Sequence, residues 1–92
     1  MIMSIDDVIT NVANVCKQCG VEKLVLIGSF ATGTATPTSD IDFVVYGCKD
    51  LDTLETHLES VETLRKIDIF DYDAIHNEYL LEDIEKYGKQ IY

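Results

Sequence analysis

Residues 23–29 read Lys-Leu-Val-Leu-Ile-Gly-Ser, and residues 39–46 read Ser-Asp-Ile-Asp-Phe-Val-Val-Tyr. Each stretch contains a short run of large apolar residues that is rich in β-formers. Such runs are typical of strands buried within a sheet. The two stretches therefore predict two core strands, with polar residues placed where the first strand ends and the second begins.

Helical patterns lie outside these two strands. Ser4 followed by Asp7 resembles a capping box, and apolar residues at helical spacing continue as far as Gly20, a typical helix stop. Asp50 is placed to begin a second helix. The apolar face of that second helix consists of Leu51, Leu54, Leu58, Val61 and Leu64.

The remaining elements complete one small domain, residues 1–92. Residues 66–71 predict a third strand and residues 76–87 a last helix, followed by a tail or short edge strand at residues 89–92. The element order is α-β-β-α-β-α, and 92 residues are enough for a single core. We expect an α+β fold: a small mixed sheet of three to four strands with the helices packed on one side.

The composition favours a soluble protein without a membrane anchor. Hydrophobic residues make up 47% of the chain, which is normal for a globular domain. No apolar run approaches the roughly 18 residues that span a bilayer. The start of the chain does not resemble a signal peptide, so we expect a cytoplasmic location. The formal net charge of −10 argues against direct nucleic-acid binding, which depends on Lys and Arg.

The cysteines and histidines resemble a metal site only superficially. Cys16 and Cys19 have C-x-x-C spacing, but both continue the apolar stripe of the first helix. A structural zinc site needs four ligands, and neither Cys48, His57 nor His76 adds a second pair. An odd count of three cysteines also argues against a disulfide framework. We interpret Cys16 and Cys19 as core residues and His57 as solvated.

A glycine-serine pair ends the first strand. Gly28 permits backbone conformations that other residues avoid, and it lets a ligand approach the main chain. Gly33 follows further along the same stretch. If residues 29–32 start a helical turn, the unpaired N–H groups of that turn form a site for an anion. This stretch is therefore a candidate phosphate-binding loop.

Acidic residues lie at the start of the second strand and within the third. Asp40 and Asp42 project to the same face, about 6.6 Å apart at Cα, so both carboxylates can bind Mg²⁺. Asp68 lies level with Asp42 if the two strands are parallel. Three acids beside a phosphate loop are the arrangement of two-metal nucleotidyl transfer. Asp71 and Asp73 are alternative third acids, and the competing interpretation of all these carboxylates is a solvated strand end.

These residues resemble a family signature. Gly28-Ser29, ten intervening residues and Asp40-Ile41-Asp42 are similar to the G-S-x10-D-x-D motif of minimal nucleotidyltransferases in the DNA polymerase β superfamily. The specific part of the resemblance covers residues 28–45, and a weaker part reaches Asp68, where the family places its third acid.

The resemblance implies a polymerase-β-like nucleotidyltransferase fold with a two-ion Mg²⁺ site. The catalytic and metal-binding residues would be Asp40, Asp42 and Asp68. The residues that bind the phosphates of ATP, or of another nucleoside triphosphate, would be Gly28, Ser29, Gly33 and Ser39. Family members often pair with a HEPN-domain toxin as its antitoxin, and some transfer AMP from ATP to a tyrosine of that toxin.

One position departs from the family pattern. Many relatives have arginine shortly after the Gly-Ser pair, where this chain has Phe30, and no Lys or Arg occurs between Lys23 and Lys49. Compensation of the triphosphate charge would then depend on metal ions and backbone N–H groups. Two hypotheses follow: an antitoxin that adenylylates a HEPN partner, or a non-catalytic module whose acidic surface occludes a basic partner.

Overall fold

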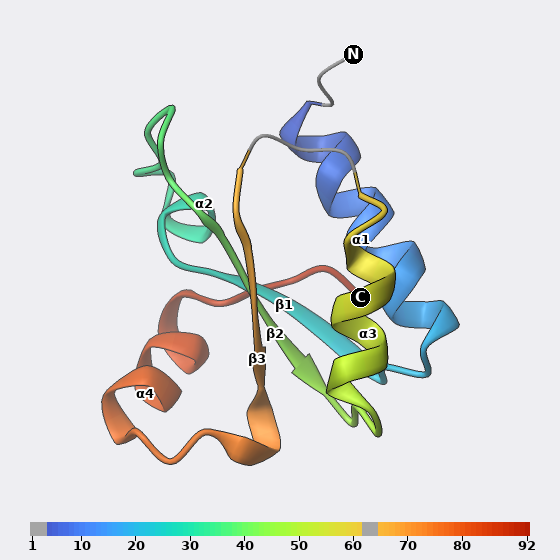
Figure 1. Ribbon diagram of the computed structural model, residues 1–92. Coiled ribbons are helices and arrows are strands. Elements are labelled where there is room, and N and C mark those ends of the chain that lie inside the picture. The colour runs from blue at the N-terminus through green and yellow to red at the C-terminus, as the bar shows by residue number, and fades with distance from the viewer. Residues whose placement is uncertain (1–3, 62–64) are drawn as a thin grey trace.

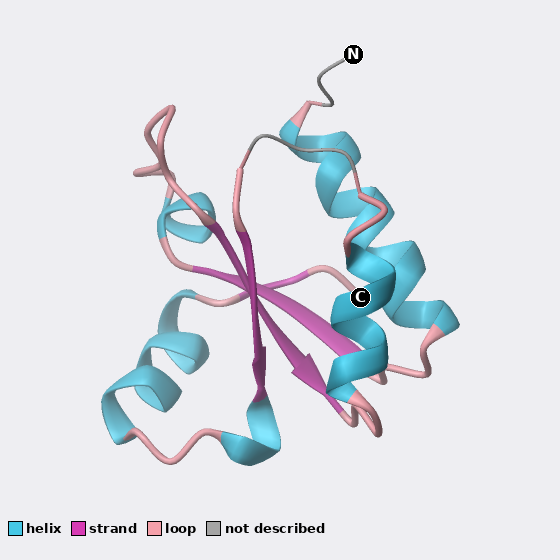
Figure 2. Ribbon diagram, viewed as in Figure 1, coloured by secondary structure: helices cyan, strands magenta, loops and turns pink. Residues whose placement is uncertain are grey.

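The computed structural model describes residues 4–61 and 65–92, which form a four-stranded sheet with helices on both faces (Figures 1 and 2). The strands are β1 (Lys23–Ile27), β2 (Ile41–Tyr46), β3 (Ile67–Asp71) and β4 (Lys89–Gln90). The helices are α1 (Ile5–Gln18), α2 (Ser29–Thr32), α3 (Leu51–Leu58), the 3₁₀ helix η1 (Tyr72–Ala74) and α4 (Glu78–Tyr87). None of the helices among these residues is long and apolar enough to cross a membrane.

The sheet is mixed, in the order β3-β2-β1-β4. Strand β1 is antiparallel to β2 and to β4, whereas β2 is parallel to β3. The α+β class and the parallel pairing of the second and third strands are therefore confirmed. The tail contributes β4, so the sheet has four strands.

Local signals begin each helix close to the expected residue. The Ser4 hydroxyl accepts a hydrogen bond from the Asp7 N–H at 3.2 Å, and the Asp50 carboxylate accepts one from Thr53 at 3.1 Å. Helix α4 begins later than expected, because the Asn77 side chain caps it by accepting from the N–H of Tyr79 at 2.9 Å.

The second long helix is shorter than its apolar pattern predicted. Helix α3 ends at Leu58. Val61 still packs against the core from the turn beyond the helix, and Leu64 lies outside the described residues. The predicted apolar face is thus confirmed only for its first part.

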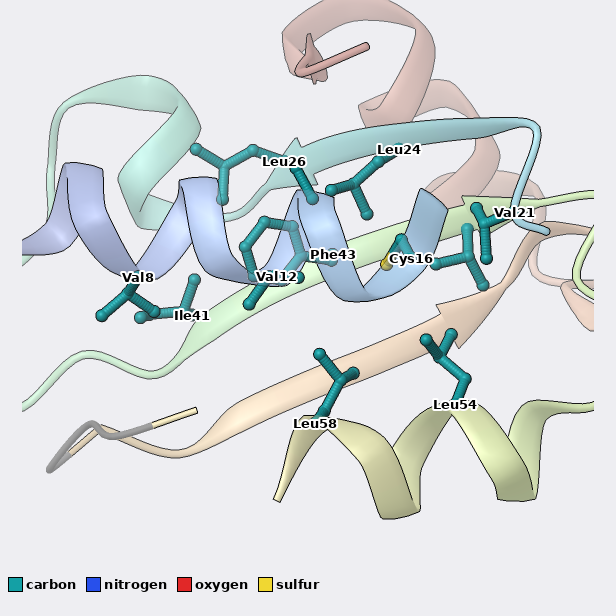
Figure 3. Close-up of a cluster of buried hydrophobic side chains, with 12 residues drawn as sticks. Val8, Val12, Cys16, Val21, Leu24, Leu26, Ile41, Phe43, Leu54 and Leu58 are labelled. Carbon is teal, nitrogen blue, oxygen red and sulfur yellow. The ribbon is translucent and has the colours of Figure 1, made fainter. Parts of the chain in front are cut away.

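One face of the sheet carries the larger core, which lies beneath α1 and α3. Figure 3 shows side chains from α1, β1, β2 and α3 meeting around Phe43. Cys16 belongs to this cluster and Cys19 packs against it, and all three cysteines are free, as predicted. The buried members are Val8, Val12, Ala13, Cys16, Val21, Leu24, Leu26, Ile41, Phe43, Val45, Leu54 and Leu58.

The opposite face is covered by α4, so the expectation of helices on one side only is wrong (Figure 1). Val25, Ile27 and Val44 point to this face and pack against Ile84 of α4. The reason lies in the strands themselves, because β1 is apolar on both faces and its second face also needs a cover. Asp42 and Asp68 lie on this second face, the face of Val44.

Candidate active site

Gly28 joins β1 to the one-turn helix α2. Its φ of 75° and ψ of −155° lie in a region that is almost restricted to glycine. Its carbonyl accepts hydrogen bonds from the N–H groups of Ala31 at 3.1 Å and Thr32 at 3.2 Å. A Cβ at this position would lie 2.7 Å from Oδ2 of Asp42. The glycine therefore lets the Asp42 carboxylate approach the main chain of the predicted phosphate loop.

Ser29 begins α2, as the sequence predicted, and Gly33 ends it in the left-handed conformation, with φ 78°. The carbonyl of Ser29 accepts a hydrogen bond from the Thr34 N–H at 2.9 Å, which closes the turn. Ser39 lies further along, where its hydroxyl accepts a hydrogen bond from the Thr36 N–H at 2.8 Å. Gly33 and Ser39 thus shape the loop, whereas Gly28 lies close to Asp42. Phosphate binding by these four residues stays a prediction.

Asp42 and Asp68 are brought together, as the sequence predicted. They are partners in the parallel register of β2 and β3. Partial burial and the negative charges of Asp68 and Asp40 raise the pKa of Asp42 above its usual value, and a side-chain hydrogen bond with Asp68 adds to the increase. Lys66 acts in the opposite direction, and its Nζ lies 3.4 Å from Oδ1 of Asp68. The positive charge of Lys66 therefore does not fully offset the effects that raise the pKa of Asp42.

The alternative third acids lie elsewhere. Asp71 pairs with Val45 near the other end of β3, and its carboxylate caps η1 by accepting a hydrogen bond from the Asp73 N–H at 3.1 Å. Asp73 follows in η1 and is exposed. The geometry therefore favours Asp68 over both alternatives.

The acidic pair suits a hard cation but does not form a complete cage. Across residues 4–61 and 65–92, no three His, Cys, Asp or Glu side chains converge closely enough to hold a metal ion. Asp40 contributes negative charge near Asp42 without completing a third protein ligand. Mg²⁺ commonly uses one or two carboxylates and takes its remaining ligands from water and substrate phosphates. The residues present fit that mode, and the three-acid ligand set stays a prediction.

A cleft of about 440 Å³ adjoins the acidic pair on the α4 face. Gly28, Thr32 and Asp42 line one part of it, next to apolar side chains of the sheet and α4. The other lining residues are Ile27, Phe70, Leu80, Asp83 and Tyr87. This volume lies within the range of small-molecule sites. The sequence did not reveal the cleft, because it depends on α4 crossing the second face of the sheet.

The structure also adds a cation that the sequence analysis missed. The Arg65 guanidinium lies 4.9 Å from the centre of the Phe30 ring, and its Nη1 donates hydrogen bonds to two loop carbonyls. Phe30 stands where the resemblance in sequence leads us to expect an arginine. The stretch between Lys23 and Lys49 contains no cation in sequence, but the fold brings one to it from residue 65.

The chain is similar in sequence to one named protein and in structure to several solved ones. A protein from Methanocaldococcus jannaschii named "Putative protein adenylyltransferase MJ1379" is 35% identical over 72 residues, covering 72% of this chain and 72% of that protein. A crystal structure described as a toxin-antitoxin with AMP-PNP has a similar fold, with a TM-score of 0.68 and 20% identity over 91% of this chain and 72% of that one.

A mutant of the toxin-antitoxin MntA-HpeT is also similar in structure. Its TM-score is 0.67 at 18% identity, over 91% of this chain and 72% of that one. These likenesses confirm the expected polymerase-β-like fold. The family model described as "Polymerase beta, Nucleotidyltransferase" matches residues 10–92. The chain therefore belongs to the polymerase β nucleotidyltransferase family.

Proposed function

We propose that this protein is a Mg²⁺-dependent nucleotidyltransferase that transfers AMP from ATP to a hydroxyl group, and that it acts as the antitoxin of a HEPN-family toxin whose tyrosine is the acceptor. The observation that carries the proposal is the alignment of Asp42 with Asp68 beside the Gly28 turn. A family of nucleotidyltransferases and a relative named as an adenylyltransferase support the same reaction class.

The position of each residue determines its proposed role. The chemistry that bound Mg²⁺ supplies is neutralisation of the triphosphate charge. Asp42 and Asp68 would hold the cation, with Asp40 as the expected third acid, and the Gly28–Ser29 main chain would bind the phosphates. Asp68 accepts the proton of the acceptor hydroxyl. The oxygen of that hydroxyl bonds to the α-phosphorus of ATP, and pyrophosphate leaves.

The cleft is suited to the nucleoside. Gly28 and Asp42 line it together with the aromatic side chains of Phe70 on β3 and Tyr87 on α4. Aromatic side chains offer flat apolar surfaces against which a base can stack. A triphosphate on the Gly28 turn would therefore leave its nucleoside next to an apolar cleft of suitable size.

A protein partner would supply the acceptor hydroxyl group. Similar folds occur in structures described as toxin-antitoxin complexes. The net charge of −10 favours association with a basic protein. Tyr79 is 82% exposed and Tyr87 57% exposed on α4, and exposed tyrosines are enriched in protein interfaces.

A non-catalytic role is the second candidate. It is favoured by the net charge of −10, because an acidic surface can bind a basic partner without any chemical step. In that case the acidic surface would bind and occlude the same toxin without modifying it.

The experiment combines the purified protein, Mg²⁺, ATP labelled at the α-phosphate and the protein encoded by the neighbouring gene. We expect label on the partner, and a loss of at least about 1000-fold with Asp42→Asn, because the cation loses a ligand. Asp71→Asn is the matched control, since it removes the same charge from β3 at a distance from the Gly28 turn. Wild-type transfer by Asp42→Asn would contradict the assignment, and tight binding without label would support occlusion.

A further inference from the structure

Arg65 lies just before β3, yet its side chain contacts the loop that leads from α2 to the start of β2. Its Nη1 donates to the carbonyl of Thr36 at 3.0 Å and to the carbonyl of Ser39 at 2.9 Å. These partners precede it by 29 and 26 residues. One guanidinium nitrogen therefore joins two points of a distant loop to the start of the third strand.

We infer that Arg65 is a positioning residue of the active site: it holds residues 34–40, and with them the backbone that leads through Asp40 to Asp42, in the observed conformation. The expected effect of Arg65 on catalysis rests on the proposed function, whereas its expected effect on the loop conformation does not. Arg65 would act through the loop and would not itself contact the reacting atoms.

The two carbonyls belong to a single tight turn. The Ser39 N–H donates to the Thr36 carbonyl at 3.1 Å, and the Thr36 N–H donates to the Ser39 hydroxyl at 2.8 Å. Arg65 adds a charged donor to both ends of this turn, and bonds of this type are stronger than neutral ones. Asp40 is the next residue after Ser39, so the direction of its backbone depends on the turn.

The same guanidinium also contacts α2. Its central carbon lies 4.9 Å from the centre of the Phe30 ring, within the range of a cation–π contact. Phe30 follows Ser29 directly in the predicted phosphate loop. Arg65 therefore connects the phosphate loop with the turn before Asp40, and Phe30 provides the surface on which it rests.

The backbone next to Arg65 aligns the acidic pair. The Lys66 carbonyl accepts a hydrogen bond from the Ile41 N–H at 2.9 Å, at the start of the parallel pairing that sets Asp42 against Asp68. Arg65 thus lies at the point where the loop, β2 and β3 meet. A residue at this point can control Asp40 without contributing to either buried core.

Lysine is not an adequate substitute at this position. A guanidinium is planar, so it can stack on a ring while its N–H groups donate in the same plane, whereas an ammonium group is a compact charge without a stacking surface. We therefore expect Arg65→Lys to keep the charge but not the loop conformation.

The first test is hydrogen exchange of the free protein, which does not depend on activity. In Arg65→Ala and Arg65→Lys, we expect the hydrogen-bonded amides within residues 34–40, those of Thr34, Thr36 and Ser39, to exchange at least about tenfold faster. The amides of β1 and β2 should stay as protected as in the wild type. Lys49→Gln is the matched control, because it removes an exposed cation outside the site. Unchanged exchange of residues 34–40, or full protection in Arg65→Lys, would overturn the inference.

A second variant separates the two kinds of contact. Phe30→Leu removes the aromatic ring and leaves both loop carbonyls available to Arg65, so we expect a smaller increase in exchange at residues 34–40 than in Arg65→Ala. If Arg65→Ala accelerates exchange across the whole chain, the fold as a whole is destabilised, and the test then depends on Phe30→Leu and Arg65→Lys. Both must then affect residues 34–40 selectively, and uniform acceleration in both would overturn the inference.

The catalytic consequence is measured as AMP transfer at increasing Mg²⁺ concentrations. We expect Arg65→Lys to need at least about tenfold more Mg²⁺ for half-maximal transfer, with little change in its thermal midpoint, because Asp40 is held less firmly. Equal Mg²⁺ dependence would contradict this consequence. If the wild type transfers no AMP, the proposed function fails, while hydrogen exchange still tests the role of Arg65 in the loop.

Discussion

The two faces of the sheet differ in what they bury and in what they leave open. The face under α1 and α3 has a cluster of twelve buried apolar residues centred on Phe43. The face under α4 has a smaller cluster around Ile84, together with Asp42, Asp68 and an open cleft of about 440 Å³. Stability is concentrated on the first face, whereas the second can accommodate a ligand.

Strand β2 belongs to both faces and shows how one segment serves both purposes. Ile41, Phe43 and Val45 point into the larger core, while Asp42 and Val44 point to the α4 face. The alternation of a strand therefore places a catalytic candidate between two buried anchors. Such an arrangement holds the carboxylate in place and keeps it accessible.

The largest expected effect on stability comes from making the same substitution, leucine to alanine, on each face of the sheet. Leu54→Ala on α3 removes a fully buried side chain and should lower the free energy of unfolding by about 3 kcal/mol. Leu80→Ala on α4 should cost about 1 kcal/mol, because Leu80 is half-buried and lines the open cleft. Urea unfolding measures both, and equal losses would contradict the division between the faces.

A pair of glycine substitutions tests the phosphate loop. Gly28→Ala should cost about 2 kcal/mol, because its backbone region is almost closed to alanine, and the new Cβ should also displace Asp42. Gly33→Ala should cost about 1 kcal/mol, since its positive φ is also unfavourable but nothing lies within 4 Å of the added Cβ.

The activity of the two glycine variants should differ more than their stability. We expect Gly28→Ala to lose AMP transfer and Gly33→Ala to retain most of it at a temperature where both are folded. Equal loss in the two variants would show that contact between the glycine backbone and Asp42 is not what matters.

The smallest expected effect is a change of stability with pH. Burial raises the pKa of Asp42 in the folded protein above its usual value, so its contribution to stability is fully present below the unfolded pKa and is lost as pH rises through the folded pKa. Asp42→Asn lacks this dependence. The stability of this variant relative to the wild type should therefore increase as pH rises from about 4 towards neutrality. A relative stability that stays constant or decreases in urea unfolding across that range would contradict the pKa direction.

Much of the fold could be predicted because its signals are local. The cap at Ser4, the apolar runs of β1 and β2 and the stop at Gly20 depend on neighbouring residues alone. The Asp42–Asp68 register was also accessible, since a helix between two strands favours a parallel crossover.

The rest depends on contacts between distant segments. The apolar pattern of α4 indicates that one side is buried, but not which face of the sheet it covers, so the cleft was not foreseen. Arg65 was missed for the same reason, because nothing in the sequence near residue 65 indicates that its side chain reaches Thr36 and Phe30. Similarly, the extent of α3 was overestimated, since an apolar spacing does not show where a helix ends.

The most direct test of the central claim is binding of Mn²⁺, as a spectroscopic substitute for Mg²⁺, in the presence of a non-hydrolysable ATP analogue. Electron paramagnetic resonance should show bound Mn²⁺ in the wild type and in Asp71→Asn, and a loss of at least about tenfold in affinity in Asp42→Asn and in Asp68→Asn. If all four proteins bind Mn²⁺ equally, the Asp42–Asp68 pair is not a cation site and the account is contradicted.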